Sequence, residues 1–123
     1  MQFLYIGIFG ACGCLSRYLV SGWVLRATGT ALPFGTLAVN VIGSFLLGLV
    51  MVGSQQSTLL SPEVRIGITV GFMGGFTTFS TFSYETIRLL EEGSFASAGA
   101  NILLNVLVCV CAAALGIFVA RQL

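Results

Sequence analysis

The chain has 123 residues, of which 57% are hydrophobic and only 7% are charged, and its mean hydropathy is +1.05. Soluble domains carry about 25% charged residues, so five arginines and four glutamates cannot cover a folded chain of this size in water. This composition excludes a soluble globular enzyme and indicates a membrane protein that crosses the bilayer several times.

The residue types that are absent narrow the chemistry further. Without His the chain has no imidazole base and no His metal ligand, and a net charge of +1 offers no basic patch for nucleic acid. No base lies beside a Ser or Cys, and no span holds paired carboxylates, so we predict that the protein is not an enzyme. The four cysteines lie in apolar stretches and are expected to be packing residues: Cys12, Cys14, Cys109 and Cys111.

Uncharged stretches divide the chain into four predicted transmembrane helices. They cover about residues 2–26, 34–53, 63–90 and 95–121. Each clears the ~20 residues that an α-helix needs to cross ~30 Å of hydrocarbon. The runs are too long and continuous for barrel strands, and Pro62 suits a helix start. The sequence therefore predicts an all-α membrane protein with one four-helix transmembrane domain, 1–123.

The arginines give this domain no preferred orientation. Four spans place both termini and the loop near 54–62 on one side, with Arg65 and Arg121, whereas Arg26 and Arg88 lie on the other side. Because two arginines lie on each side, the positive-inside rule favours neither orientation. Two interpretations stay open: weak topology signals, or a chain that inserts in both orientations and pairs antiparallel with itself.

Small residues and one arginine mark the helix contacts. Glycines at short spacing in the first and third spans predict close backbone packing: Gly7, Gly10, Gly13, Gly67, Gly71 and Gly75. Arg17 lies well inside the first span. It could snorkel to the interface, hold carbonyls of a neighbouring helix, or supply a field at a vestibule.

The third span has an unusual middle, which reads GFMGGFTTFSTFSYE from Gly71 to Glu85. Gly74 and Gly75 predict a helix break at mid-membrane, because Gly is unfavourable inside helices. The backbone groups freed there must meet protein, water or an ion. A cation could take freed carbonyls and an anion freed amides; a glycine-lined packing crossover is the alternative.

Five of the seven residues from 77 to 83, after this predicted break, carry hydroxyl groups: Thr77, Thr78, Ser80, Thr81 and Ser83. Such hydroxyls often bond to their own helix carbonyls. Thr78, Thr81 and Glu85 share one helical face, however, and a carboxylate within a span is a functional candidate. Pairing of Glu85 with Arg88 at the surface is the alternative.

Aromatic and amide side chains complete the candidate site. Phe76, Phe79 and Phe82 form a stripe that ordinarily serves packing, but the positive edge of a Phe ring can also stabilise a small anion. Weak repeated contacts of this kind let an ion leave again. Asn40 stands on a small polar stripe of the second span (with Thr36, Gly43 and Ser44), and Asn101, Asn105 and Cys109 share a face of the fourth span. Each amide could bind an anion or form an interhelical hydrogen bond.

Two of these segments resemble the Fluc (CrcB) family of fluoride channels. GGFTTFSTFSYE, from Gly74 to Glu85, resembles the family signature, and GTLAVNVIGSFLLG, from Gly35 to Gly48, resembles its second-helix motif. The resemblance implies a passive, fluoride-selective channel of the bacterial cytoplasmic (inner) membrane, which exports trapped cytoplasmic fluoride and so gives fluoride resistance. It also implies an antiparallel dual-topology homodimer with two pores. The expected partners are fluoride, a second copy and the lipid bilayer, without nucleic acid.

The resemblance also assigns roles to residues. Phe79 and Phe82 would meet fluoride with their ring edges, Asn40 would be the pore residue of the second helix, and Arg17 would lie near a vestibule. The hydroxyls of Ser80, Thr81 and Ser83 would form a polar track, with Glu85 toward a pore end. Gly74 and Thr77 would bracket the break, whose carbonyls in both subunits would hold a structural sodium ion. Phe76 departs from the usual family residue and is expected to be a packing residue.

Two other functions can be weighed on the same residues. A small four-helix drug exporter needs a carboxylate deep in the first span, where this chain has Arg17. A structural subunit without transport activity would leave the Phe, Ser and Thr residues of the third span unexplained. The fluoride channel is therefore the favoured hypothesis.

Overall fold

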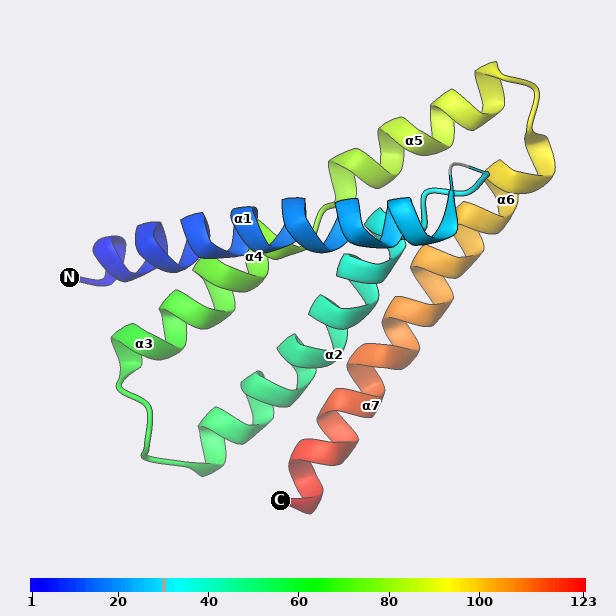
Figure 1. The fold of residues 1–123 in the computed structure, drawn as a ribbon. Coiled ribbons are helices and arrows are strands. Elements are labelled where there is room, and N and C mark those ends of the chain that lie inside the picture. Colours follow the sequence, from blue (N-terminus) through cyan, green and yellow to red (C-terminus); the bar gives the residue numbers. More distant parts are fainter. Residues whose placement is uncertain (30) are drawn as a thin grey trace.

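The computed structural model describes residues 1–29 and 31–123, and this part of the chain is helical without any strand (Figure 1). The elements are α1 (Gln2–Thr28), α2 (Phe34–Gln56), α3 (Pro62–Ile66), the π-helical segment η1 (Gly67–Phe72), α4 (Met73–Phe76), α5 (Phe79–Glu91), α6 (Phe95–Leu103), the π-helical segment η2 (Leu104–Val108) and α7 (Cys109–Gln122). The prediction of an all-α protein is confirmed.

Three helical stretches in the described part are long and apolar enough to cross a membrane: Gln2–Thr28, Phe34–Gln56 and Phe95–Gln122. The predicted third span is also helical, but it is divided into a rod that ends at Phe76 and a second rod that begins at Phe79. Ser61 caps the first of these rods, since its side chain accepts a hydrogen bond from the N–H of Val64, and Pro62 occupies the first turn as predicted.

The rods pack in two groups (Figure 1). α2 lies along the continuous rod of α6, η2 and α7, while α1 crosses the rod of α3, η1 and α4. Both termini and the loop over 57–61 lie toward one end of the molecule, and the turn over 92–94 lies toward the other. This is the arrangement that four successive spans require.

Close glycine contacts hold both groups together. A Cβ at Gly71 would lie 2.7 Å from the carbonyl oxygen of Ile6, and one at Gly75 would lie 2.6 Å from that of Gly10. Gly116 of α7 packs in the same way against the backbone of Phe45. The predicted packing role is confirmed for Gly71 and Gly75. At Gly7 a Cβ would meet no described atom within 4 Å, so Gly7 makes no such close contact within the described chain.

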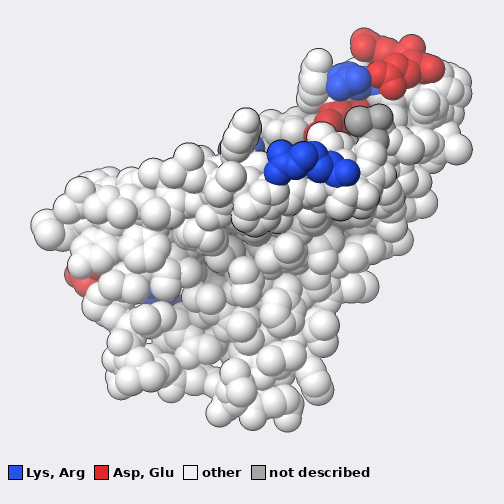
Figure 2. Space-filling model, viewed as in Figure 1, with Lys and Arg blue, Asp and Glu red and all other residues white. Residues whose placement is uncertain are grey.

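Apolar side chains cover much of the exterior. Figure 2 shows uncharged residues over most of the visible face, with a concentration of charges at one end. Tyr18, Trp23 and Phe118 are among the many large apolar side chains that are more than half exposed. An apolar exterior is favourable in lipid and unfavourable in water.

Candidate functional site

The third span is interrupted at Thr77 and Thr78, and not at the predicted pair of glycines. Thr77 has φ −90° and ψ 158°, and Thr78 has φ −152° and ψ 117°, so both are extended. Gly74 and Gly75 lie inside α4. A break at the two glycines is therefore wrong, and of the two residues expected to bracket it only Thr77 lies at the break. Gly75 serves close packing against α1, while two β-branched threonines take the extended conformation.

Thr78 restarts the helix as the N-cap of α5. Its Oγ1 accepts a hydrogen bond from the backbone N–H of Thr81 (3.2 Å) and donates one to Oγ1 of Thr81 (3.0 Å). A threonine hydroxyl at this position satisfies one of the N–H groups that every helix start leaves free. Among the closely spaced hydroxyl groups of this segment, that of Thr78 therefore has a structural role as a helix cap.

Asn40 of α2 bonds to the interrupted backbone. Its Oδ1 accepts from the N–H of Thr78 (2.8 Å), and its Nδ2 donates to the carbonyl oxygen of Thr78 (3.0 Å) and to Oδ1 of Asn105 (3.0 Å). Both amide donors of Asn40 are thus engaged within the chain. The interhelical hydrogen bond considered from the sequence is present, and it joins α2 to the break and to η2.

The carbonyls at the end of α4 differ in their partners. Nε of Arg17 donates to the carbonyl oxygen of Gly75 at 2.9 Å, so Arg17 holds a carbonyl of a neighbouring helix, one of its three predicted alternatives. The carbonyl oxygens of Gly74 and Thr77 accept no hydrogen bond from residues 1–29 or 31–123. Gly74 is also exposed, so this end of α4 is open to a partner outside the chain.

The aromatic stripe divides into buried and exposed rings. Phe76 is only 4% exposed and stacks on Phe72, in agreement with its predicted packing role. Phe79 is 76% exposed and Phe82 only 7% exposed, and their rings meet edge to face with centroids 5.4 Å apart and an interplanar angle of 61°. The two rings proposed to meet fluoride therefore contact each other, and one of them faces outward.

A cavity of about 380 Å³ lies beside the break and these rings. Its lining includes the break itself, both rings and polar residues of two other rods: Thr77, Thr78, Phe79, Phe82, Asn40, Ser44, Asn105 and Cys109. The structure thus brings together Asn40, Phe79 and Phe82, which the sequence singled out separately. It also places Asn105 and Cys109 of the fourth span at this cavity.

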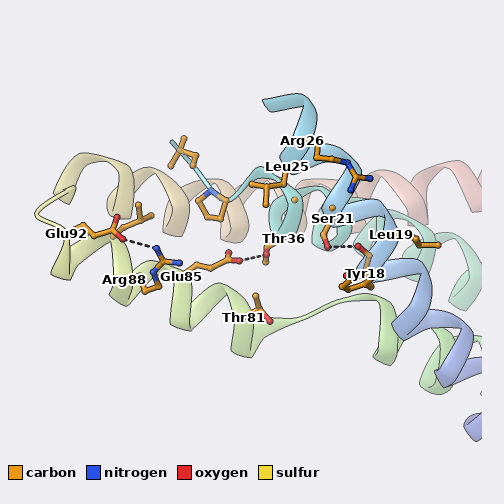
Figure 3. A pocket seen from close by; sticks show the side chains of 15 residues that line it. Tyr18, Leu19, Ser21, Leu25, Arg26, Thr36, Thr81, Glu85, Arg88 and Glu92 are labelled. Atoms are coloured by element: carbon orange, nitrogen blue, oxygen red, sulfur yellow. Dashed lines mark hydrogen bonds and ion pairs between the residues drawn. The ribbon is translucent and has the colours of Figure 1, made fainter. Parts of the chain in front are cut away.

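A second cavity of about 500 Å³ lies between the C-terminal half of α1, the start of α2 and α5 (Figure 3). Thr81 and Glu85 line it together with Thr36, Arg26 and Arg88. Of the predicted site residues, Asn40, Thr77, Phe79 and Phe82 therefore line one cavity and Thr81 and Glu85 the other, whereas Arg17, Gly74, Ser80 and Ser83 line neither. Ser80 is exposed, and the hydroxyl of Ser83 donates to the carbonyl of Phe79 in its own helix at 2.9 Å.

Glu85 is bound by a threonine and not by the arginine one turn away. Oγ1 of Thr36 donates to Oε1 of Glu85 at 2.7 Å, while Arg88 pairs with Glu92 at 2.9 Å (Figure 3). The alternative of a Glu85–Arg88 ion pair is therefore wrong. Oε2 of Glu85 is buried and finds no partner within the described ranges.

The sequence did not reveal the two π-helical segments or the part played by Thr86. Oγ1 of Thr86 donates to the carbonyl of Phe82 at 2.8 Å and accepts from Nδ2 of Asn101 at 3.0 Å. Its position four residues after Phe82, on the same helical face, was the available signal. Within the described part, no group of three or more Cys, Asp or Glu side chains could hold a metal ion.

Comparison with known proteins identifies the family. Residues 4–117 match the family described as CrcB-like protein, Camphor Resistance (CrcB). The chain is 69% identical to the Fluoride-specific ion channel FluC of Syntrophotalea carbinolica over 123 residues, which cover 100% of both chains. The proteins of the same name from Geotalea daltonii and Geobacter sulfurreducens are 58% and 57% identical over 120 residues, which are 98% of this chain and 97% of each relative. This multi-pass membrane protein therefore belongs to the CrcB family of fluoride ion channels, which are transporters and not enzymes.

Proposed function

We propose that this chain is a passive fluoride-selective channel that lets cytoplasmic fluoride leave a bacterial cell across the inner membrane, down its electrochemical gradient. The observation that carries the proposal is the 69% identity, over the full length of both chains, to a protein named as a fluoride-specific ion channel. The cavity beside the break supplies fitting chemistry, since it combines ring edges with polar groups and contains no charged side chain.

In the proposed mechanism, fluoride exchanges its water for weak partners along α5. The positive ring edges of Phe79 and Phe82 receive the anion without a formal charge that would trap it. The hydroxyls of Ser80, Thr81 and Ser83 form the polar track, and Glu85 lies toward one end of it. Because weak partners repeat along the helix, no single contact holds the ion strongly.

In this proposal Asn40 holds the break in its extended form and also contacts fluoride. Both of its N–H groups are engaged, by the carbonyl of Thr78 and by Oδ1 of Asn105, so a direct contact with fluoride requires one of these bonds to exchange. In the absence of such an exchange, Asn40 stabilises the extended backbone of Thr78 at the break. Arg17 lies outside both cavity linings, and its bond to Gly75 supports the same region from α1.

The functional unit in this proposal is an antiparallel, dual-topology homodimer with two pores. A ring that is 76% exposed, as Phe79 is, would be covered by a second copy, and each pore would be lined by residues of both copies. The arginines divided equally between the two sides support insertion in both orientations.

A structural sodium ion between the two copies completes the proposal. The carbonyl oxygens of Gly74 and Thr77 fit such an ion, because alkali cations prefer oxygen ligands and these two oxygens accept no hydrogen bond from the described residues. Carbonyls freed within a membrane need a partner. These two carbonyls would hold the cation beside the C-terminal end of α4, where it would balance the partial negative charge of that helix end.

Efflux from liposomes tests this function. Purified protein is reconstituted in liposomes loaded with fluoride and chloride, a potassium ionophore balances the charge, and two ion-selective electrodes record both anions. Fast fluoride efflux with negligible chloride efflux is the expected result. A folded dimer that releases no fluoride would refute the proposal, and proton-coupled cation transport would then be measured.

A further inference from the structure

All three asparagines of the chain belong to one ladder of hydrogen bonds, which is half-buried at Asn40 and buried at Asn105 and Asn101. Asn40 donates to Oδ1 of Asn105, Asn105 donates to Oδ1 and to the backbone carbonyl of Asn101, and Asn101 donates to Oγ1 of Thr86, each at 3.0 Å. Thr86 then donates to the carbonyl of Phe82 at 2.8 Å. The ladder therefore runs from α2 through η2 and α6 to α5.

The donors of this ladder all point in one direction. Each amide gives its N–H to the next member and accepts from the previous one. Rotating the amide of Asn40 or Asn105 would set oxygen against oxygen, and rotating that of Asn101 would set its NH₂ group against the NH₂ group of Asn105. Asn101 is 2% exposed, Thr86 6% and Asn105 7%, so water has little access to replace a lost bond. The N–H and carbonyl of Thr78 orient the amide of Asn40, and the same donor direction continues along the ladder as far as Thr86.

Both ends of the ladder attach to the segment that carries the two rings. One end reaches the backbone of Thr78 through Asn40, and the other reaches the carbonyl of Phe82 through Thr86. Phe79 and Phe82 lie between these two anchors in the first turns of α5. Thr86 and Asn101 thus lie on the hydrogen-bonded path between the two anchors, although neither residue lines either cavity.

We infer that Thr86, Asn101 and Asn105 are positioning residues, which fix the amide of Asn40 on the break and so hold the rings of Phe79 and Phe82 in place for ion passage. Thr86 and Asn101 act only through other residues. Asn105 also borders the cavity beside the break, where its Oδ1 accepts a hydrogen bond from Nδ2 of Asn40. The link to fluoride passage rests on the proposed function, whereas the ladder itself does not.

Substitution of Thr86 tests the ladder at its far end. Thr86→Val removes the oxygen at nearly constant volume, and Thr86→Ser restores it. Thr69→Val is the matched control, because Thr69 also bonds to the carbonyl four residues earlier but forms no hydrogen bond with an asparagine in the described part of the chain. Thr86→Ala removes the same oxygen without branching and replaces Thr86→Val should that variant not fold.

The first readout is the side-chain amide spectrum. Protein labelled with ¹⁵N-asparagine in lipid nanodiscs, without fluoride, gives three NH₂ groups, which are assigned by substituting one asparagine at a time. We expect Thr86→Val to move the signals of Asn101, Asn105 and Asn40, Thr86→Ser to restore them, and Thr69→Val to leave them unchanged. A shift confined to Asn101 would overturn the inference, because a local structural effect does not reach Asn40.

The second readout is fluoride efflux. Thr86→Val should slow efflux about tenfold, because the loss of one ordinary hydrogen bond at the rate-limiting barrier changes a rate by about that factor. Thr86→Ser should restore the original efflux rate. Unchanged efflux in Thr86→Val, with all three amide signals moved, would refute the positioning role. Absence of efflux from the unsubstituted protein would refute the proposed function instead, while the amide spectrum would still decide whether the ladder is coupled.

Discussion

The side chain of Asn40 bonds to both backbone groups of Thr78, accepting from its N–H at 2.8 Å and donating to its carbonyl at 3.0 Å. The two residues are separated by 38 positions in the sequence. An interrupted helix leaves such groups without their usual partners, and lipid offers none. One side chain of α2 thus makes the extended conformation of Thr78 stable within the membrane.

Replacing Asn40 should therefore lower both stability and efflux. Asn40→Leu leaves the N–H and carbonyl of Thr78 unpaired, which costs about 1–3 kcal/mol for each group. Asn40→Asp keeps one acceptor but sets an oxygen against the carbonyl of Thr78 and Oδ1 of Asn105, so anion efflux should be lost. Denaturant unfolding and fluoride efflux measure these effects, with Gln56→Leu at the end of α2 as the control. Normal efflux in Asn40→Asp would remove Asn40 from the conduction pathway.

Alanine substitutions of Phe79 and Phe82 should differ in their effect on stability, although both should reduce fluoride efflux. Phe79→Ala removes a ring that is 76% exposed in the single chain, so we expect loss of fluoride efflux with little change in the stability of the monomer. Phe82→Ala removes a ring that is only 7% exposed and should cost about 3–5 kcal/mol of unfolding free energy as well. Phe95→Ala, at a position 70% exposed, is the matched control. Wild-type efflux from Phe79→Ala or from folded Phe82→Ala would exclude a role of that ring edge.

Neighbouring glycines should behave differently when each is changed to alanine. A Cβ at Gly75 would lie 2.6 Å from the carbonyl oxygen of Gly10 and 3.0 Å from the amide nitrogen of Cys14, so Gly75→Ala should separate α1 from α4 and destabilise the chain. At Gly74 no described atom lies within 4 Å of such a Cβ. Gly74→Ala should therefore spare the fold and weaken only the association of two copies.

Thermal unfolding and chemical cross-linking distinguish the two glycine effects. Gly53→Ala in α2 is the control, because its Cβ also meets no described atom within 4 Å. If Gly74→Ala dimerises as well as Gly53→Ala does, the face of α4 around Gly74 is not covered by a second copy. If cross-links form only between parallel copies, the antiparallel arrangement is excluded.

Thr36 should control the carboxylate of Glu85. Its hydroxyl donates to Oε1 at 2.7 Å, and Oε2 has no partner in the described part of the chain, so Thr36→Val leaves both oxygens without a donor. We expect Thr36→Val to lower stability by about 1–3 kcal/mol and to slow efflux, whereas Thr36→Ser keeps the hydroxyl and both properties. Denaturant titration measures the stability of both variants, and the fluoride electrode measures their efflux. Equal behaviour of the two variants would show that the hydroxyl is dispensable.

Local features of the sequence predicted the class of protein well. The hydrophobic spans, Pro62 at a helix start and the packing of Gly71 and Gly75 all follow from composition or spacing within one segment. The position of the break could not be predicted in this way. Gly74 and Gly75 have the weaker helix propensity, yet contact with α1 keeps Gly75 helical, and Asn40 stabilises the extended Thr78 instead.

Composition and hydropathy are enough to establish that this chain is helical and resides in a membrane, because apolar length and the lack of charge act along each segment independently of the others. The sequence also marked Asn40, Phe79, Phe82 and Glu85 as unusual residues for such segments. The bonds of Asn40 to Thr78 and Asn105, 38 and 65 positions away, and the bond of Thr36 to Glu85 could be found only from the packed helices. Hydrogen bonds between distant residues depend on how the helices cross, which is settled when the whole chain packs.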